Sequence, residues 1–167
     1  MLFSIITVVY NGADTIGPTI ESVNAQSFRD FEHIVVDGLS KDGTCDLVRK
    51  LANPANLLLQ SEPDKGIYDA MNKGLRLASG DYVLFLNAGD RLHDAETLAI
   101  VARLIKENNF PGVVYGQTDI VDAEGKRIAS RHLTAPETLT ADSFKNGMLV
   151  CHQAFYALRS ITEPYNL

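Results

Sequence analysis

The chain has 167 residues, of which 46% are hydrophobic and 22% charged, and its formal net charge is −6. This length and composition indicate one globular domain that can bury a sizeable core. The acidic balance argues against a nucleic-acid partner, because duplex binding requires a basic face. It does not exclude a nucleotide, which a few backbone amides and one cation can hold.

Apolar runs alternate with helical patterns through the first half of the chain. Short β-branched or aliphatic runs predict strands, and apolar residues at steps of three and four predict helices. The expected elements, in chain order, are strands at 2–9, 31–37, 56–60 and 82–86, with helices at 16–26, 44–51 and 67–78 between them. Because strands and helices alternate, we predict a parallel sheet core with flanking helices.

The second half begins with another helical pattern and ends less regularly. The expected elements are a helix at 95–108, a strand at 113–121, a turn at 122–125, an antiparallel return strand at 126–131, loop and short helix at 133–145, and a strand with a polar insertion at 147–156. The hairpin adds antiparallel pairing, so the prediction is an α/β fold with a mixed sheet. The final residues show neither a helix stop nor a polar tail, which leads us to expect a C-terminally truncated domain.

Compartment follows from the cysteines and from the apolar runs. Cys45 and Cys151 lack metal-ligand spacing and do not suggest a disulfide framework, so we expect a reducing, cytoplasmic compartment. The N terminus has no basic-then-apolar signal peptide, and no apolar run approaches the roughly 18 residues of a membrane span. We expect no integral membrane segment, while peripheral association with the inner face of the membrane stays open.

Polar residues follow two of the predicted buried strands. In an open parallel sheet, ligands bind outside the carboxyl ends of the strands. Asp37 ends the second strand, where the ribose or base of a nucleotide is commonly held; the alternative is that Asp37 or Asp42 caps the next helix. Asn87 and Asp90 follow the central strand, and here the alternative is a loop that only caps a helix.

Two familiar nucleotide-binding motifs are missing. A Rossmann dinucleotide site needs G-x-G-x-x-G at the first turn, where only Gly12 and Gly17 are present. A P-loop needs G-x-x-x-x-G-K-S/T, and no segment supplies it. The sequence therefore favours neither an NAD enzyme nor a P-loop NTPase.

Five ordered segments carry a resemblance to a known family. They are residues 4–12 (SIITVVYNG), 22–28 (SVNAQSF), 37–44 (DGLSKDGT), 62–74 (EPDKGIYDAMNKG) and 79–90 (SGDYVLFLNAGD). In this order and spacing, the chain resembles a family-2 glycosyltransferase of the GT-A fold. The branch it resembles has the DKGIYDAMNKG helix and occurs among bacterial polysaccharide and capsule transferases.

The resemblance implies transfer of a sugar from a nucleotide-diphosphate donor, with inversion, to a saccharide or lipid-linked acceptor in cell-surface polysaccharide synthesis. A UDP-sugar is the default donor, and GDP- and dTDP-sugars remain open. The whole chain, 1–167, would be one glycosyltransferase domain. Residues 1–90 would form its nucleotide-sugar-binding half and residues 91–167 the start of its acceptor-side half.

The resemblance also implies a set of donor-binding residues. These are Thr7, Tyr10, Asp37, Asp64, Lys65, Gly66 and Asn87. Thr7 and Tyr10 would line the base pocket, and Asp37 would hydrogen-bond the base or ribose. The segment 64–66 would border the ribose and diphosphate; Lys65 is the cation best placed to meet phosphate, with an exposed, solvated lysine as the alternative.

The acidic loop departs from the family's usual Asp-x-Asp pattern. Here the aligned residues are Asn87, Ala88, Gly89 and Asp90, so only Asp90 can bind a cation through a carboxylate. Mn²⁺ or Mg²⁺ can be held by one carboxylate together with diphosphate and water, so we expect a metal that binds weakly without nucleotide. Asn87 could add a carbonyl oxygen or bond the ribose. His93 is either an extra ligand or a surface histidine.

The acceptor side is less defined. His152 and Gln153 lie where the resembled branch places a polar pair on the acceptor side, and a buried, satisfied histidine is the alternative. Neither Asp119 nor Asp122 lies where the family has its general base. We expect that base beyond Leu167, so this chain should bind nucleotide and transfer sugar poorly.

Two other classes of function stay open. One is a catalytically inactive nucleotide-binding module, which the thinned acidic motif favours. The other is a sugar nucleotidyltransferase, although residues 10–14 are not the Gly-rich basic loop of that class. A truncated domain would expose part of its sheet, so a homodimer also remains open.

Overall fold

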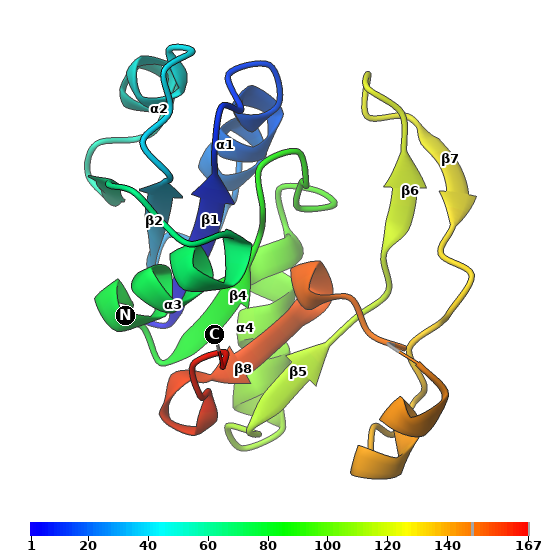
Figure 1. The fold of residues 1–167 in the computed structure, drawn as a ribbon. Helices are drawn as coiled ribbons and strands as arrows, with labels where there is room; N and C mark the ends of the chain where they lie inside the picture. Colours follow the sequence, from blue (N-terminus) through cyan, green and yellow to red (C-terminus); the bar gives the residue numbers. More distant parts are fainter. Residues whose placement is uncertain (148, 167) are drawn as a thin grey trace.

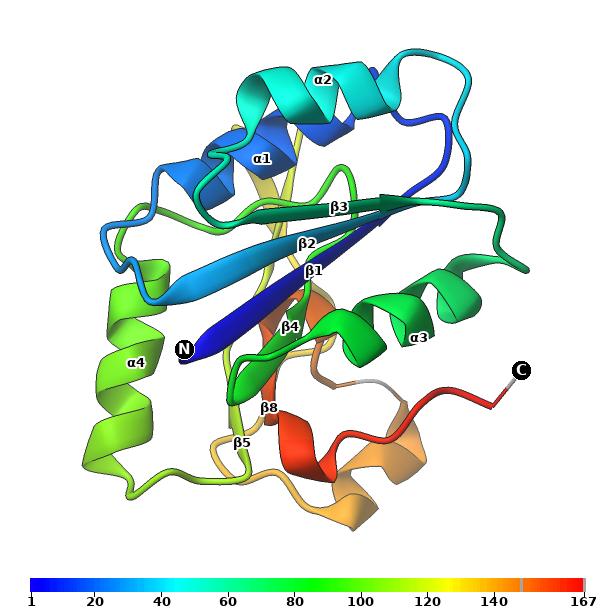
Figure 2. The same ribbon diagram turned by 90° about the vertical axis from the view of Figure 1, so that its left-hand side faces the viewer.

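The computed structural model describes residues 1–147 and 149–166; Met148 and Leu167 lie outside this description. A six-stranded sheet lies between helices, in the strand order β3-β2-β1-β4-β8-β5 (Figure 1 and Figure 2). The strands are β1 Phe3–Val9, β2 Phe31–Asp37, β3 Leu57–Ser61, β4 Tyr82–Phe85, β5 Val113–Tyr115 and β8 Phe155–Leu158. The helices are α1 Ile16–Asn24, α2 Thr44–Leu51, α3 Ile67–Leu77 and α4 Thr97–Glu107.

The sheet has a parallel core, as predicted. β3, β2, β1 and β4 run parallel to their neighbours, and β8 pairs antiparallel with both β4 and β5. α1 and α2 cover one face of the sheet and α3 the other (Figure 2). The mixed α/β architecture with flanking helices is therefore confirmed.

The central strand β1 is buried at every position, because both of its faces are covered. Successive side chains point to opposite faces of a strand. Ile6 and Val8 accordingly pack in the cluster that contains the buried face of α3. Val9 packs with α1 and α2, and Ile5 packs with α4. This double covering explains why the strand is a continuous apolar run.

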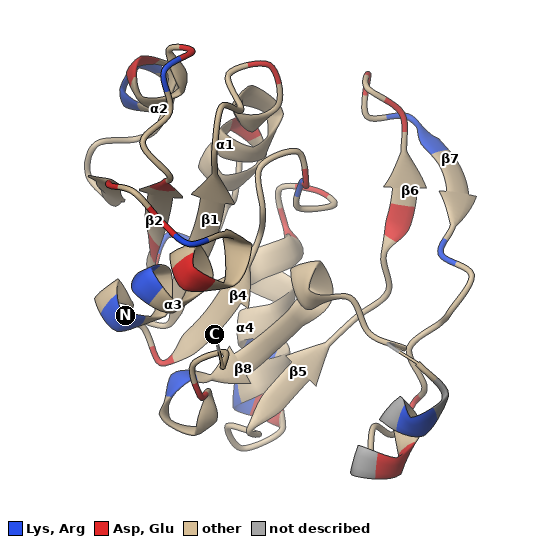
Figure 3. Ribbon diagram, in the orientation of Figure 1, with Lys and Arg blue, Asp and Glu red and all other residues tan. Residues whose placement is uncertain are grey.

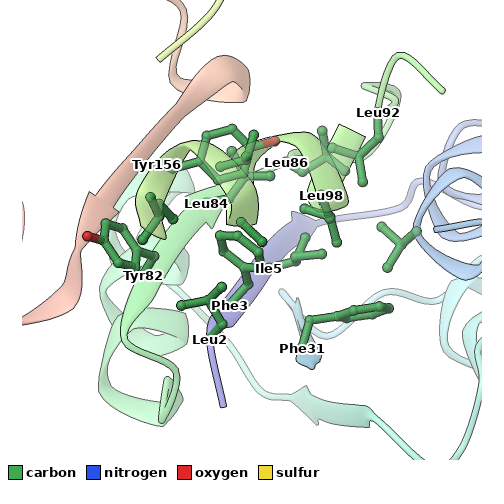
Figure 4. Close-up of a cluster of buried hydrophobic side chains, with 14 residues drawn as sticks. Leu2, Phe3, Ile5, Phe31, Tyr82, Leu84, Leu86, Leu92, Leu98 and Tyr156 are labelled. Carbon is green, nitrogen blue, oxygen red and sulfur yellow. The ribbon is translucent and has the colours of Figure 1, made fainter. Parts of the chain in front are cut away.

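Aromatic side chains fill the core beneath α4. Phe3 lies between the rings of Tyr82 and Tyr156, with centroid separations of 6.5 and 5.8 Å. Leu98 of α4 packs into the same cluster (Figure 4). Tyr82 keeps its polar end satisfied by donating a hydrogen bond from its hydroxyl to the carbonyl oxygen of Pro111 at 2.6 Å. The cluster joins β1, β4, β8 and α4 into one body.

Helix α3 approaches the sheet closely at a glycine. A Cβ added to Gly74 would collide with the side chain of Ile6 and lie 3.5 Å from Val36 Cγ2. The helix therefore needs Gly74 at this position to bury Ala70 and Met71 against β1 and β2. This close packing of α3 on the sheet places the start of the helix at the carboxyl edge.

The predicted strand at 113–121 is two strands with different partners. β5 ends at Tyr115, and Gly116 donates the next backbone hydrogen bond to Ala154. The side chain of Gln117 then bonds the backbone of Ala135 in both directions, at 2.9 and 3.0 Å, which draws the chain away from the sheet. A continuous β pattern in the sequence hid this change of direction.

The predicted hairpin forms, but outside the main sheet. β6 Asp119–Val121 and β7 Arg127–Ser130 pair only with each other and make a separate two-stranded ribbon (Figure 1). The antiparallel strand of the main sheet is instead β8. The expectation that the hairpin supplies the antiparallel pairing of that sheet is therefore wrong.

The predicted strand at 147–156 is also wrong in its extent. The short 3₁₀ helices are η1 Ala141–Asn146, η2 His152–Ala154 and η3 Arg159–Ile161. β8 begins only at Phe155, because η2 takes up the polar stretch that precedes it.

Within residues 1–147 and 149–166, every helix is too short or too polar to traverse a lipid bilayer.

Candidate functional site

The carboxyl ends of three parallel strands bring the predicted polar residues to one edge of the sheet. Val9 at the end of β1 is paired in register with Asp37 at the end of β2. Tyr10 follows β1 directly, and Asn87 lies two positions beyond the end of β4. Strands β1, β4 and β8 carry no charged residue, whereas β2, β6, β7, the helices and the loops do (Figure 3).

Asp37 is a fully buried carboxylate with one oxygen occupied. Its Oδ2 accepts hydrogen bonds from the Ser40 amide at 3.0 Å, the Ser61 hydroxyl at 2.6 Å and the Cys45 thiol at 3.2 Å. Burial opposes ionisation, but these hydrogen bonds outweigh it and lower the pKa of Asp37. Its Oδ1 has no hydrogen-bond partner within the described part of the chain. An ionised carboxylate thus keeps one buried oxygen without a hydrogen-bond partner.

The helix-capping alternative belongs to Asp42 and not to Asp37. Asp42 Oδ1 accepts from the backbone N–H of Thr44, the first residue of α2, at 3.1 Å. Its Oδ2 accepts from the amide of Ala13 at 3.0 Å. The hydrogen bond from the Thr44 hydroxyl is the largest cause that lowers the pKa of Asp42. Asp42 therefore ties the loop after β1 to the start of α2.

A glycine separates Tyr10 from Asp64. A Cβ added to Gly38 would lie 3.2 Å from Tyr10 Cδ2 and 2.6 Å from Asp64 Oδ2. The Tyr10 ring and the Asp64 carboxylate therefore both lie where a side chain at Gly38 would point, and they leave no room for one. Tyr10 remains 67% exposed. The structure brings three predicted features together here: the exposed Tyr10 ring, Asp64 and the end of β2.

Thr7 lies near the end of the central strand β1. Its side chain is fully buried, and its hydroxyl donates to the carbonyl oxygen of Leu86 at 2.8 Å. The Thr7 hydroxyl oxygen also lies 2.9 Å from Nε2 of His33. Neighbouring side chains cover its hydroxyl on a strand buried on both faces, and its role in the base pocket stays a prediction.

The segment before α3 is fixed by hydrogen bonds to carboxylates. Asp64 Oδ1 accepts from the Gly66 amide at 2.8 Å, and Asp69 Oδ2 accepts from the Lys65 amide at 3.0 Å. Gly66 has φ +114°, a conformation that favours glycine. The Lys65 side chain stays exposed at this turn. A buried lysine that sequence reasoning missed, Lys73, donates to the Pro63 carbonyl at 2.5 Å and steadies the same segment.

The loop after β4 meets η2 through side-chain contacts that the sequence did not predict. Gln153 donates from Nε2 to Asp90 Oδ2 at 3.0 Å, and Asn87 Nδ2 lies 3.1 Å from His152 Nε2. Because the amide nitrogen can only donate, His152 Nε2 accepts and the ring proton is on Nδ1. Burial lowers the pKa of His152, and the nearby Asp90 charge only partly opposes this. His152 is therefore a neutral, hydrogen-bonded imidazole.

The two side-chain amides that meet at this contact each keep an unpartnered oxygen. Asn87 Oδ1 and Gln153 Oε1 are buried and have no hydrogen-bond partner among residues 1–147 and 149–166. Burial raises the pKa of Asp90, more than the hydrogen bond from Gln153 and the effect of His152 lower it. Hard divalent cations bind carboxylate and amide oxygens. These three side chains therefore fit a Mg²⁺ or Mn²⁺ ion that brings further ligands with it.

The protein alone supplies an incomplete metal site. In the described part of the chain, no three His, Cys, Asp or Glu side chains form a group that could hold a metal ion. The side chain of His93 is 77% exposed and contacts Asp94, so His93 is a surface histidine in this structure. Metal binding here would rest on one carboxylate and two amide oxygens, with other ligands from a bound molecule.

Arg91 is a residue of this loop that sequence reasoning missed. Its Nη2 donates to the carbonyl oxygen of Ala123 in the β6–β7 turn at 2.9 Å. A Cβ added to Gly125 would collide with its guanidinium. The arginine thus ties the separate hairpin to the loop that contains Asp90. No local sequence signal identifies a contact over such a separation.

A family model and curated relatives match the chain. The model of glycosyl transferase family 2 matches residues 4–163. A PGL/p-HBAD biosynthesis glycosyltransferase of Mycobacterium bovis is 35% identical over 171 aligned positions, covering 99% of this chain and 64% of the relative. The chain thus spans less than two thirds of the length of this relative.

Solved structures of the same kind align with the fold. S. aureus TarS, in complex with UDP-GlcNAc, has a TM-score of 0.71 and 29% identity, with 81% of this chain and 39% of that chain covered. The mannosyltransferase PcManGT from Pyrobaculum calidifontis, in complex with GDP-Man and Mn²⁺, has a TM-score of 0.59 and 28% identity, with 68% and 34% covered. The likeness of the chain to both transferases supports a GT-A fold.

Proposed function

The chain belongs to glycosyl transferase family 2, and from this premise we propose that it binds a nucleotide-diphosphate sugar at the carboxyl edge of β1, β2 and β4. The sugar would pass to a saccharide or lipid-linked acceptor in the synthesis of a surface polysaccharide or glycoconjugate. A UDP-sugar is the first candidate, supported by the UDP-GlcNAc complex of TarS, and the GDP-Man complex of PcManGT keeps GDP-sugars in the comparison. The activity would take place in the cytoplasm, at the inner face of the membrane.

The observation that carries this proposal is the contact of the loop after β4 with η2. Asp90 and Gln153 are 63 positions apart, yet they are hydrogen-bonded, and the side-chain oxygens of Gln153 and Asn87 are buried without a partner in the described part of the chain. Such oxygens are costly to bury unless a ligand completes them. The edge of the sheet that holds this contact also holds Asp37 with its unpartnered oxygen. A diphosphate with a cation at one end and a nucleoside at the other would satisfy both.

The donor residues take roles that follow from their surroundings. Asp37 would accept a hydrogen bond from the ribose or base through Oδ1, because Oδ2 is already occupied. Tyr10 would stack on the base through its exposed ring. Lys65 would approach the diphosphate from the fixed turn before α3, with Asp64 and Gly66 bordering the ribose.

Asp90, Asn87 and Gln153 would hold Mn²⁺ or Mg²⁺. When bound, such an ion neutralises the charge that develops on the departing diphosphate. These residues contribute oriented oxygens in a site that is partly shielded from water. His152, as a neutral imidazole, would orient the donor sugar or the acceptor through its hydrogen-bonding edge.

The reaction proposed is a direct displacement with inversion. The oxygen of an acceptor hydroxyl bonds to the anomeric carbon while the bond from that carbon to the diphosphate oxygen breaks. The nucleoside diphosphate leaves with the electron pair, and the hydroxyl proton passes to a general base, to which we assign no residue of this chain. Residues 1–90 would supply the donor half of this site and residues 91–167 the beginning of its acceptor side.

Calorimetric titration tests the proposal. UDP, GDP and dTDP are titrated with and without Mn²⁺ into the wild-type protein, Asp90→Ala and the control Asp46→Asn. Asp46 is an acid whose side chain is 88% exposed on α2. We expect metal-dependent binding of one nucleotide that Asp90→Ala loses and Asp46→Asn keeps. Folded wild-type protein that binds none of the three nucleotides would contradict the proposal.

A nucleotide-binding module without catalysis is the second candidate. The observation that favours it is the single carboxylate in the described acidic loop. Incubation of the protein with radiolabelled UDP-sugars, and measurement of released UDP, separates the two readings. Nucleotide binding without release of UDP and without transfer of sugar to any acceptor glycan would favour the non-catalytic module. Turnover of a UDP-sugar would exclude that module.

A further inference from the structure

Two exposed tyrosines from distant parts of the chain meet beside the proposed site. The ring centroids of Tyr68 on α3 and Tyr165 in the C-terminal segment are 4.9 Å apart, with an interplanar angle of 38°. Phe85, at the end of β4, lies behind Tyr165 at 6.1 Å. Tyr68 is 54% and Tyr165 40% exposed. The pair is thus supported from the core side and open to solvent on the other.

The position of Tyr165 is set by a buried side chain. After β8 and η3, the chain returns along α3 toward the carboxyl edge of the sheet (Figure 2). There Asn72 donates from Nδ2 to the Tyr165 carbonyl oxygen at 2.9 Å and accepts at Oδ1 from the Tyr165 amide at 2.7 Å. Asn72 is one helical turn beyond Tyr68 and only 4% exposed. One helix therefore positions both rings.

The location of the pair ties it to the donor residues. Tyr68 lies three positions after Lys65, and Phe85 precedes Asn87 by two positions. The base-stacking residue Tyr10 belongs to the loop after β1, next to Asp64 across Gly38. The two aromatic surfaces therefore have different positions at the same edge, one after β1 and one between β4 and α3.

The chemistry of the pair fits a ring with an apolar face. Packing alone would bury these rings, whereas here large aromatic surfaces are held rigid and left exposed, as in binding sites. A pyranose presents C–H groups on its face and hydroxyls at its rim. Aromatic faces carry partial negative charge that attracts such C–H groups, and the phenol hydroxyls can bond the rim. We propose that Tyr68 and Tyr165 form a stacking surface for a sugar ring of a saccharide acceptor.

This inference rests on the proposed function, and saturation-transfer NMR tests it separately. The probes are methyl glycosides of glucose, galactose, mannose, N-acetylglucosamine and rhamnose, added to the wild-type protein saturated with UDP and Mn²⁺. We expect saturation of ring C–H protons on one face of at least one glycoside. Tyr68→Ala and Tyr165→Ala should weaken that glycoside's binding about tenfold, since an aromatic contact contributes of the order of one factor of ten.

Matched variants distinguish stacking from folding and from nucleotide binding. Tyr68→Phe and Tyr165→Phe keep the rings and should keep most of the saturation. Tyr10→Ala should weaken UDP binding and leave glycoside binding to the Tyr68–Tyr165 pair intact. Tyr68→Ala and Tyr165→Ala should keep the UDP affinity and the thermal midpoint near those of the wild type.

The outcomes separate the two proposals. Wild-type protein that binds UDP but saturates none of the glycosides overturns the stacking surface and leaves the proposed function standing. The stacking surface is also overturned if the two alanine variants show the same glycoside saturation as the wild type. It is likewise overturned if Tyr68→Ala loses UDP binding and keeps glycoside binding. Wild-type protein that binds no nucleotide contradicts the proposed function itself.

Discussion

The hydroxyl of Thr7 joins His33 to the carbonyl oxygen of Leu86, at 2.9 and 2.8 Å. A carbonyl oxygen only accepts, so Thr7 donates to Leu86 and accepts from His33 Nε2–H. Nε2 therefore carries a proton, and Nδ1 is buried without a hydrogen-bond partner in the described part of the chain. Burial lowers the pKa of His33 to about 4.

Stability should fall on acidification because of His33. In the unfolded chain this histidine binds a proton near its ordinary pKa of 6.5, whereas in the folded chain it does so only near 4. Between these values the unfolded state binds more protons, so the free energy of unfolding decreases as the pH falls. The contribution amounts to as much as about 3 kcal/mol. Urea unfolding at pH values from 7.5 to 4.5, chosen around this window, measures it.

His33→Gln isolates this effect. Glutamine keeps an N–H donor for Thr7 and does not titrate, so the variant should lose most of the pH dependence. His132→Gln, at an exposed position, should keep the dependence of the wild type. An unchanged pH profile in His33→Gln would mean that another group is responsible.

Asn87→Asp should strengthen metal binding in the absence of nucleotide. It places a second carboxylate where the Asn87 amide oxygen is buried without a partner in the described part of the chain. Added ligand charge raises cation affinity, and we expect an increase of about tenfold for Mn²⁺. Without metal, repulsion between the two carboxylates should lower the thermal midpoint, and Mn²⁺ should restore it. Electron paramagnetic resonance of free Mn²⁺ gives the affinity.

Asn109→Asp is the control for added charge, at an exposed position after α4 with φ +57°. It should leave Mn²⁺ affinity unchanged. Equal affinities for wild-type protein and Asn87→Asp would show that Asp90, Asn87 and Gln153 do not form the cation site.

Gly125→Ala should destabilise the hairpin by two effects. Gly125 has φ +84°, which costs a non-glycine residue roughly 1 kcal/mol, and its new Cβ would collide with Arg91. Gly43→Ala is the matched comparison, since Gly43 has φ +91° and nothing within 4 Å of an added Cβ. Urea unfolding and hydrogen exchange of the β7 amides should show the larger loss for Gly125→Ala.

The double variant Arg91→Ala with Gly125→Ala tests the collision itself. Removing the guanidinium should abolish the extra cost that Gly125→Ala carries over Gly43→Ala. An extra cost that persists without Arg91 would show that the collision does not cause it.

Asn72→Ala should release the C-terminal segment from α3. The change removes two hydrogen bonds to the Tyr165 backbone and should cost about 2 kcal/mol. Limited proteolysis should then cut residues 162–166 faster. Asn72→Asp, which keeps only an acceptor, should be intermediate. Equal protection of this segment in all three proteins would contradict the role of Asn72.

The local pattern was sufficient for the elements of the first half. Helix α2 has the predicted bounds, and β1, β2 and α1 differ from prediction by no more than two residues. Their periodicity is set by which faces are buried, and that information is contained in short windows of sequence. The same holds for the polar residues at strand ends, because topology brings the ends of parallel strands together.

Long-range pairing decided what the pattern left open. Which strand completes the sheet depends on partners far along the chain. The hairpin strands β6 and β7 pair only with each other, and β8 supplies the antiparallel strand of the main sheet. The capping alternatives for Asp37 and Asp42 were equivalent in sequence, and only the backbone around Thr44 distinguished them.

The sequence by itself determined the family, the order of elements in the parallel core, and the strand ends at which polar chemistry gathers. The tertiary structure alone decided that Gln153 bonds Asp90, that Asn72 holds Tyr165, and that the Thr7 hydroxyl is buried. The physical reason is that an amphipathic period records burial of a face, whereas a hydrogen bond between distant segments depends on how the faces are stacked.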